Sequence, residues 1–153
     1  MKMKELTTSN ITLKKLWDKS QSKGWALSII GSLVYCILDI FDCMPCDYYG
    51  IPYYVIGKNW GGFSLGWFFI VGSESDDNLK NHEVGHIVQN AEVGGLSMLG
   101  WTICSIFRYW TRRIFGSKTP YDSWWFEGNA TALGNEFIKR RIEDERAKET
   151  SDC

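Results

Sequence analysis

This 153-residue chain lacks an excess of either charge and lacks long apolar runs. Its 17 basic and 18 acidic residues give a net charge of -1, so there is no broad basic footprint and we expect no nucleic-acid partner. Its longest apolar run, residues 25–41, is about 17 residues long, which is the lower edge of what spans a bilayer. A hydrophobic content of 44% nevertheless favours one ordered domain with a real core.

The five cysteines are scattered along the chain, and the N-terminus shows no secretory cleavage pattern. The odd number of cysteines favours a reduced compartment, and therefore a cytoplasmic or membrane-associated protein rather than a secreted one. Cys43 and Cys46 have CxxC spacing, but there is no second pair. Because buried cysteine commonly packs as a small hydrophobe, this spacing alone assigns no role.

Polar and apolar residues divide the chain into four parts. Residues 1–24 are polar and lysine-rich, residues 25–42 form an apolar helix, residues 43–142 form the domain with the candidate chemistry, and residues 143–153 form a charged tail. An apolar helix of this length either contacts a membrane or packs in a core. Hydropathy does not choose between these two.

The central region predicts a β-hairpin followed by a helix. Ile51 to Lys58 and Phe63 to Val71 are rich in β-branched and aromatic residues, and the turn-like residues 59–62 join them, which indicates two antiparallel strands. Polar residues that suit an N-cap precede a helix from Asn78 to Val93, which Gly94-Gly95 stops. A last helix is expected from Trp124 to about Lys148. The expected fold class is α+β and mainly helical.

The only two histidines, His82 and His86, stand four residues apart in the helix predicted over residues 78–93, and Glu83 follows the first. Residues i and i+4 share a helix face, so both imidazoles can bind one Zn²⁺ while Glu83 reaches a water molecule beside it. Composition alone gives this pattern about once in a thousand sequences. It is typical of zinc-dependent hydrolases.

A catalytic zinc usually takes three protein ligands, and this chain has no third histidine. Glu92 stands where the metzincin pattern places its last histidine, so the third ligand has to be a carboxylate. We favour Glu127, because a carboxylate amid Trp and Phe needs a charge partner. Small residues nearby would also let its helix approach the motif helix closely: Gly128, Ala130 and Gly134. The alternative ligands are Glu92, Asp122 and Glu136.

A topological constraint follows from this ligand set. A second apolar run, Val93 to Phe107, separates the histidines from the C-terminal third of the chain. If both apolar runs crossed a membrane, the histidines and Glu127 would lie on opposite sides. We therefore expect at most one full span, with Val93 to Phe107 buried or lying in the interface.

Three segments resemble those of a family of uncharacterised, membrane-associated bacterial zincin-like proteins: Asn59–Gly66 (NWGGFSLG), Asn81–Asn90 (NHEVGHIVQN) and Tyr121–Ala130 (YDSWWFEGNA). The resemblance covers residues 50–136 and is most distinctive in the last two segments. It implies a zincin-like domain of the gluzincin type, with His82, His86 and Glu127 on Zn²⁺ and Glu83 as general base. The family is similar to metallopeptidases by motif, which leaves the substrate undefined.

The predicted chemistry is hydrolysis of a peptide or protein substrate by activated water. Zinc polarises the scissile carbonyl and lowers the pKa of water, while Glu83 takes a proton and delivers it to the leaving amine. By fold analogy, Phe63 to Val71 can hold an extended peptide by edge pairing. Candidates to orient the imidazoles are Asp122, Asn90 and Asn129. The alternative is a non-catalytic, metal-stabilised, membrane-associated interaction protein.

Overall fold

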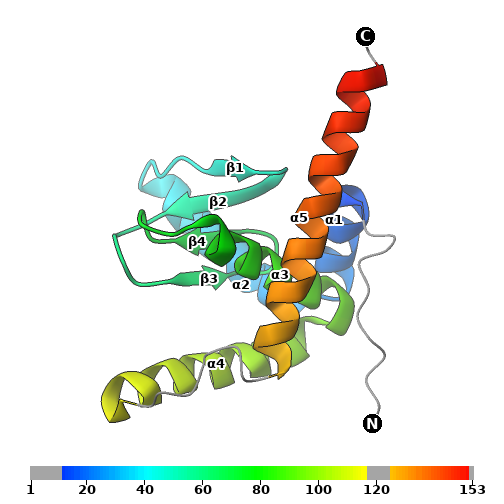
Figure 1. Ribbon diagram of the computed structural model, residues 1–153. Coiled ribbons are helices and arrows are strands. Elements are labelled where there is room, and N and C mark those ends of the chain that lie inside the picture. The colour runs from blue at the N-terminus through cyan, green and yellow to red at the C-terminus, as the bar shows by residue number, and fades with distance from the viewer. Residues whose placement is uncertain (1–11, 117–124, 152–153) are drawn as a thin grey trace.

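The computed structural model describes residues 12–116 and 125–151, where five helices surround a four-stranded sheet (Figure 1). The expected α+β class is confirmed. The chain order is α1 (Leu13–Ser22), α2 (Trp25–Ile40), β1 (Cys46–Tyr48), β2 (Ile51–Val55), β3 (Gly62–Ser64), β4 (Phe69–Val71), α3 (Asp77–Val93), α4 (Gly95–Phe115) and α5 (Trp125–Ser151).

The sheet is mixed, so the prediction of one antiparallel hairpin from Ile51 to Val71 is wrong. Its strand order is β1-β2-β4-β3, in which β4 pairs parallel to β2 and antiparallel to β3. The predicted second strand breaks in two because Gly66 has a φ of 77°, in a turn where the Leu65 N–H donates to the Phe68 carbonyl. The chain after β2 therefore runs to the sheet edge as β3 and returns beside β2 as β4.

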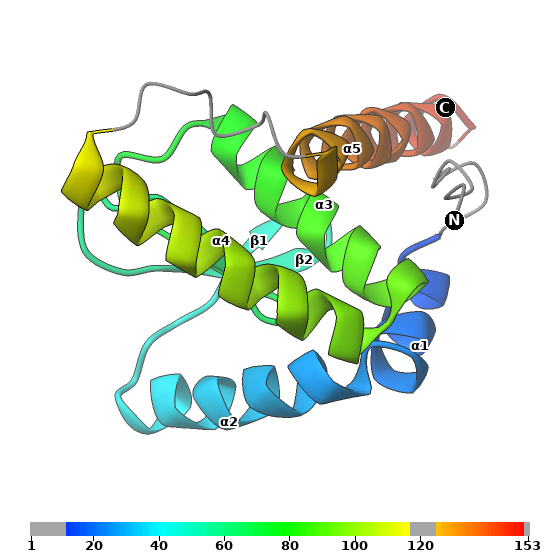
Figure 2. The same cartoon turned by 90° about the horizontal axis from the view of Figure 1, so that it is seen from below.

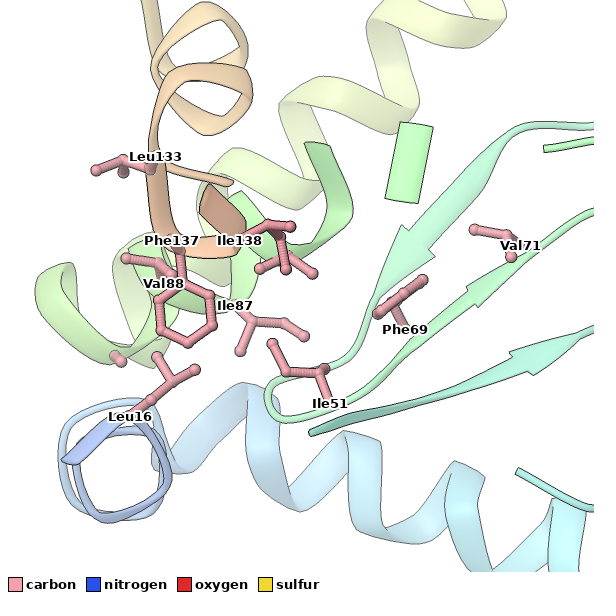
Figure 3. Close-up of a cluster of buried hydrophobic side chains, with 11 residues drawn as sticks. Leu16, Ile51, Phe69, Val71, Ile87, Val88, Leu133, Phe137 and Ile138 are labelled. Atoms are coloured by element: carbon pink, nitrogen blue, oxygen red, sulfur yellow. The ribbon is translucent and has the colours of Figure 1, made fainter. Parts of the chain in front are cut away.

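Alternating side chains place the sheet between two layers of helix. One face contributes Ile51, Phe69 and Val71 to a core with α1, α3 and α5, and Figure 3 shows these side chains converging with Leu16 and Ile87. The opposite face packs against α2, with a second buried cluster of Leu38, Tyr54, Leu65 and Phe68. The helix α3 thus lies against the sheet on one side and contacts α5 and α1 on the other.

The helix α3 has the boundaries that its end signals predict. The Asp76 side chain caps it by accepting the Leu79 N–H at 2.9 Å, and the helix ends at Gly94, whose φ is 103°. It contacts α1, α4, α5, β3 and β4, and its residues from His82 to Ala91 are buried except for the partly exposed His86. The predicted central position of the motif helix is confirmed.

Close contact between α3 and α5 depends on small residues, as the sequence predicts. A Cβ added at Gly85 would collide with the Ala130 carbonyl, and one added at Gly134 would collide with the Asn81 carbonyl. The two helices contact each other here and are neighbours in both Figure 1 and Figure 2. The approach brings Glu127, on the first turn of α5, to the face of α3 that carries the histidines.

Substituting Gly134→Ala should destabilise the fold, because backbone atoms of α3 have to move to admit the methyl group. We expect the free energy of unfolding to fall by about 1–3 kcal/mol, the range for overpacking. The control is Gly100→Ala on α4, where the added Cβ meets nothing within 4 Å and alanine should be neutral or slightly stabilising. Urea unfolding followed by circular dichroism measures both variants. Equal stability of the two would contradict this account of the α3–α5 contact.

The first apolar run forms α2, which follows α1 after a bend of 100°. The second run is part of α4, which continues to Phe115. In residues 12–116 and 125–151, no single helix is long and apolar enough to cross a membrane, whereas α1 and α2 taken together reach that length and composition.

Candidate metal centre

Three side chains from two helices meet at one point. The Nε2 atoms of His82 and His86 are 3.1 Å apart, and Glu127 Oε2 lies 3.2 Å from each of them. Both imidazoles are nearly buried and Glu127 is fully buried. The three predicted ligand residues are therefore neighbours, although Glu127 lies 45 positions after His82 in the chain.

The tautomer of His86 is set by a chain of hydrogen bonds behind it. Gln89 Nε2 donates to the Phe126 carbonyl at 2.7 Å, and a carbonyl can only accept, so the Gln89 amide oxygen has to face the other way. That oxygen lies 2.9 Å from His86 Nδ1 and requires a proton there. In neutral His86 the lone pair is therefore on Nε2, which faces Glu127 and His82.

The same reasoning fixes His82. The Thr131 hydroxyl donates to the Glu127 carbonyl one turn earlier on α5, so its oxygen accepts from His82 Nδ1 at 2.8 Å. Neutral His82 likewise carries its lone pair on Nε2. In their neutral forms both imidazoles thus present an unprotonated nitrogen, which could bind a metal ion, to the same point.

A serine on α4 positions the side chain of Glu127. The Ser105 hydroxyl donates to Glu127 Oε1, which leaves Oε2 directed at the imidazoles. Burial alone would raise the pKa of Glu127, but contacts with His82 and His86 outweigh it and hold the pKa well below the usual range. Burial lowers the pKa of His86, while the contact with Glu127 and the charge of Glu83 raise it, and the net shift is upward. The carboxylate is therefore ionised at neutral pH.

The meeting point of these atoms requires a positive charge. With neutral imidazoles it holds three acceptors, and Glu127 Oε2 is buried without a hydrogen-bond donor among the described residues. Either protons on the imidazoles or a metal ion can fill this role. A tetrahedral Zn²⁺ with bonds of about 2.0–2.2 Å separates its ligand atoms by about 3.3–3.6 Å, so separations of 3.1–3.2 Å fit the ion with shifts of a few tenths of an ångström. The donor set fits zinc.

Glu83 lies on the same helix and is held against the sheet edge. The Ser64 hydroxyl on β3 lies 2.6 Å from Glu83 Oε2, and a Cβ at Gly62 would come within 2.6 Å of Glu83 Oε1. A side chain at position 62 would therefore force the Glu83 carboxylate to move from its place beside β3. Glu83 is 4% exposed and lines the same cavity as both histidines.

This cavity has a volume of about 590 Å³ and lies between β3, α3, α4 and the start of α5. Its polar side chains are the histidines, Glu83, Asn78 and several hydroxyls, whereas most of the lining is apolar and aromatic: Trp60, Phe63, Leu79, Met98, Trp101, Ile106, Tyr109, Trp110 and Phe126. Such a cavity suits a ligand with an apolar group next to a polar, reactive one.

The predicted orienting residues have different positions. Asn90 does not serve the site, because its amide donates to Ser20 and to the Gly66 carbonyl at the junction of α1 with the sheet. Asn129 acts on His86 through Gln89. Its side-chain oxygen accepts a hydrogen bond from Gln89, and Gln89 contacts His86. Asp122 lies outside the described residues. The prediction for Asn90 is wrong because that residue lies one turn past His86 and fills the close contact with Gly24.

The remaining alternative ligands on described residues have other partners. Glu92 pairs with Lys19 of α1, and Glu136 pairs with Arg140 one turn along α5. Within the part of the chain that the structure describes, only Glu127 combines with the two imidazoles to form a group of possible metal ligands.

Sequence reasoning missed Gln89, Thr131 and Ser105. Gln89 and Thr131 could have been found from the sequence. Gln89 is a polar residue one turn from His86, and Thr131 is a polar residue one turn from Glu127, on helices that the sequence predicts. Ser105 has no comparable signal, since it comes from a third helix whose packing is not encoded in a local pattern.

Comparisons with known proteins assign no relative: no family model, curated protein or solved structure matches this chain.

Proposed function

We propose that this chain is a zinc-dependent hydrolase of the gluzincin-like type and acts as a peptidase. In this proposal His82, His86 and Glu127 bind Zn²⁺, and Glu83 is the general base. The observation that carries it is the convergence of two Nε2 lone pairs and one buried carboxylate oxygen within 3.2 Å, each fixed from behind by its own hydrogen bond. With neutral imidazoles, a metal-free core would direct three acceptors at one another and gain nothing from it.

When bound, zinc supplies a Lewis acid that polarises a carbonyl and makes water acidic near neutral pH. Glu83 is suited to accept the proton of the attacking water, because it faces the cavity and sits one residue from a ligand. The Ser64 hydroxyl holds one carboxylate oxygen, which leaves the other to exchange the proton. The same carboxyl then protonates the leaving amine.

The edge strand β3 is the candidate substrate support. Residues 61–64 line the cavity, and among the described residues β3 pairs with β4 alone, so its outer edge has backbone groups that an extended peptide can bind. The earlier expectation applied to all of Phe63 to Val71, but β4 lies inside the sheet and only β3 is positioned for edge pairing. The neighbouring apolar lining favours a substrate with a bulky apolar side chain beside the scissile bond.

Metal analysis of purified protein beside the His82→Ala variant tests the premise. After incubation with Zn²⁺ and removal of unbound ion, we expect about one zinc per wild-type chain and a large loss in the variant, because a catalytic site needs all three ligands. Circular dichroism verifies that the variant is folded. A wild-type chain that retains no zinc, or a folded variant that retains as much as wild type, would contradict the proposal.

A further inference from the structure

Ser105 stands on the face of α4 that lines the cavity. The residues of α4 that line the cavity run from Met98 to Trp110 and recur every three or four positions, as the residues of one helix face do. Ser105 lies in the middle of this row, and its hydroxyl donates to Glu127 Oε1. The helix that forms one wall of the cavity therefore also contacts a carboxylate of the candidate metal centre.

The two carboxylate oxygens of Glu127 have different surroundings. Oε2 lies 3.2 Å from the Nε2 atoms of His82 and His86, whereas Oε1 accepts the hydrogen bond from Ser105. This hydrogen bond is one of the contacts that hold the pKa of Glu127 below its usual range. Because the side chain is fully buried, bulk water does not replace the Ser105 hydroxyl if that contact is lost. One oxygen thus faces the imidazoles while the other is bound to α4.

This arrangement bears on how Glu127 can bind a metal ion. A carboxylate binds metal ions through one oxygen or through both. For both oxygens to bind here, the carboxyl group would have to turn until Oε1 also faced the imidazoles, and Oε1 would move away from Ser105. A hydrogen bond to an ionised carboxylate is stronger than one between neutral groups, so its loss in a buried site opposes that turn. The Ser105 hydroxyl therefore favours binding through Oε2 alone.

The number of oxygens that Glu127 contributes decides whether a position remains for water. Two Nε2 atoms and one carboxylate oxygen supply three ligand atoms, and a catalytic site keeps its fourth position for water. A second oxygen from Glu127 would compete with water for that position. In the proposed mechanism Glu83 takes its proton from this water, and Glu83 lines the same cavity. A hydroxyl on α4 can thus protect the position where the attacking water binds.

We propose that Ser105 is a positioning residue that keeps Glu127 on the metal ion through Oε2 alone and so leaves one coordination position for water. The inference rests on the proposed function, because it requires an ion bound by His82, His86 and Glu127. It assigns a role to a residue outside the two helices that carry these ligands. The wall of the cavity on α4 then sets the coordination number of the ion as well as the shape of the substrate site.

The visible absorption spectrum of the full chain loaded with Co²⁺ tests this role without any substrate. Four-coordinate Co²⁺ absorbs visible light several-fold more strongly than five-coordinate Co²⁺, so the spectrum reports the coordination number. We expect a four-coordinate spectrum for the wild type. Ser105→Ala should still bind Co²⁺ but lose at least about half of this absorption, because Oε1 is then free to join the ion. Ser105→Thr keeps the hydroxyl and should restore the wild-type spectrum.

The matched control is Ser97→Ala, which makes the same change at an exposed position about two turns earlier on α4 and should give the wild-type spectrum. If circular dichroism shows that Ser105→Ala is unfolded, Ser105→Gly also lacks the hydroxyl and replaces it with the same expectation.

A five-coordinate spectrum in the wild type overturns the role of Ser105, and so does a wild-type spectrum in a folded variant that lacks the hydroxyl. Both results leave a metal centre in place, so the proposed function survives them. A wild-type chain that binds neither Co²⁺ nor Zn²⁺ overturns the proposed function and this inference together.

Discussion

Replacing Glu83 with glutamine is expected to lower peptide hydrolysis by about 100- to 10,000-fold while zinc content stays at the wild-type level. Glutamine keeps the volume and can still accept the Ser64 hydrogen bond, so the packing of α3 against β3 should persist. What it loses is the ability to take a proton from water. We therefore expect the substitution to lower the rate and to leave the proposed ligands, the two imidazoles and Glu127, unchanged.

A peptide library with quenched fluorophores, assayed on zinc-loaded protein, measures this effect. The control is Glu92→Gln, on the same helix, where the carboxylate pairs with Lys19 and activity should remain. A Glu83→Gln variant that cleaves as fast as wild type would remove Glu83 as the base. If the zinc-loaded wild type itself cleaves nothing in a broad library, the alternative of a metal-stabilised interaction protein is favoured.

Local signals explain what could be predicted from the sequence. The start and end of α3 depend on Asp76 and on Gly94, and both act within one turn of the helix. The two histidines and Glu83 share one helix, so their common position follows from helical geometry alone. Glu127 was predictable for a different reason, since a carboxylate surrounded by Trp and Phe implies a partner for its charge.

Contacts between distant segments explain what could not be predicted. The strand order depends on which strand β4 pairs with after the turn at Gly66. A sequence pattern that predicts two strands does not distinguish parallel from antiparallel pairing. Ser105 reaches Glu127 only because α4 folds back beneath α5. Asn90 shares a helix face with the histidines, yet it contacts the α1–α2 corner because a full turn separates it from His86.

Replacing Glu127 with alanine should weaken zinc binding by well over 100-fold, beyond the 10- to 100-fold typical of residues that only orient a ligand. In the proposed site its carboxylate supplies one of three ligand atoms and the negative charge that balances the ion. Its removal leaves two imidazoles, which form a weaker and neutral site. Competition with a chromophoric chelator measures the affinity directly.

Because Glu127 is fully buried, alanine also opens a cavity, and Glu127→Gln separates that effect from the loss of charge. Glutamine preserves the volume and the Ser105 contact, so it should fold like wild type and still bind zinc much more weakly. The controls Glu92→Ala and Glu136→Ala test the other two carboxylates and should leave affinity within a few fold. Normal zinc affinity in folded Glu127→Gln, together with a loss in either control, would transfer the third ligand to that residue. The prediction thus separates a carboxylate that binds the metal from one that only fills the core between α4 and α5.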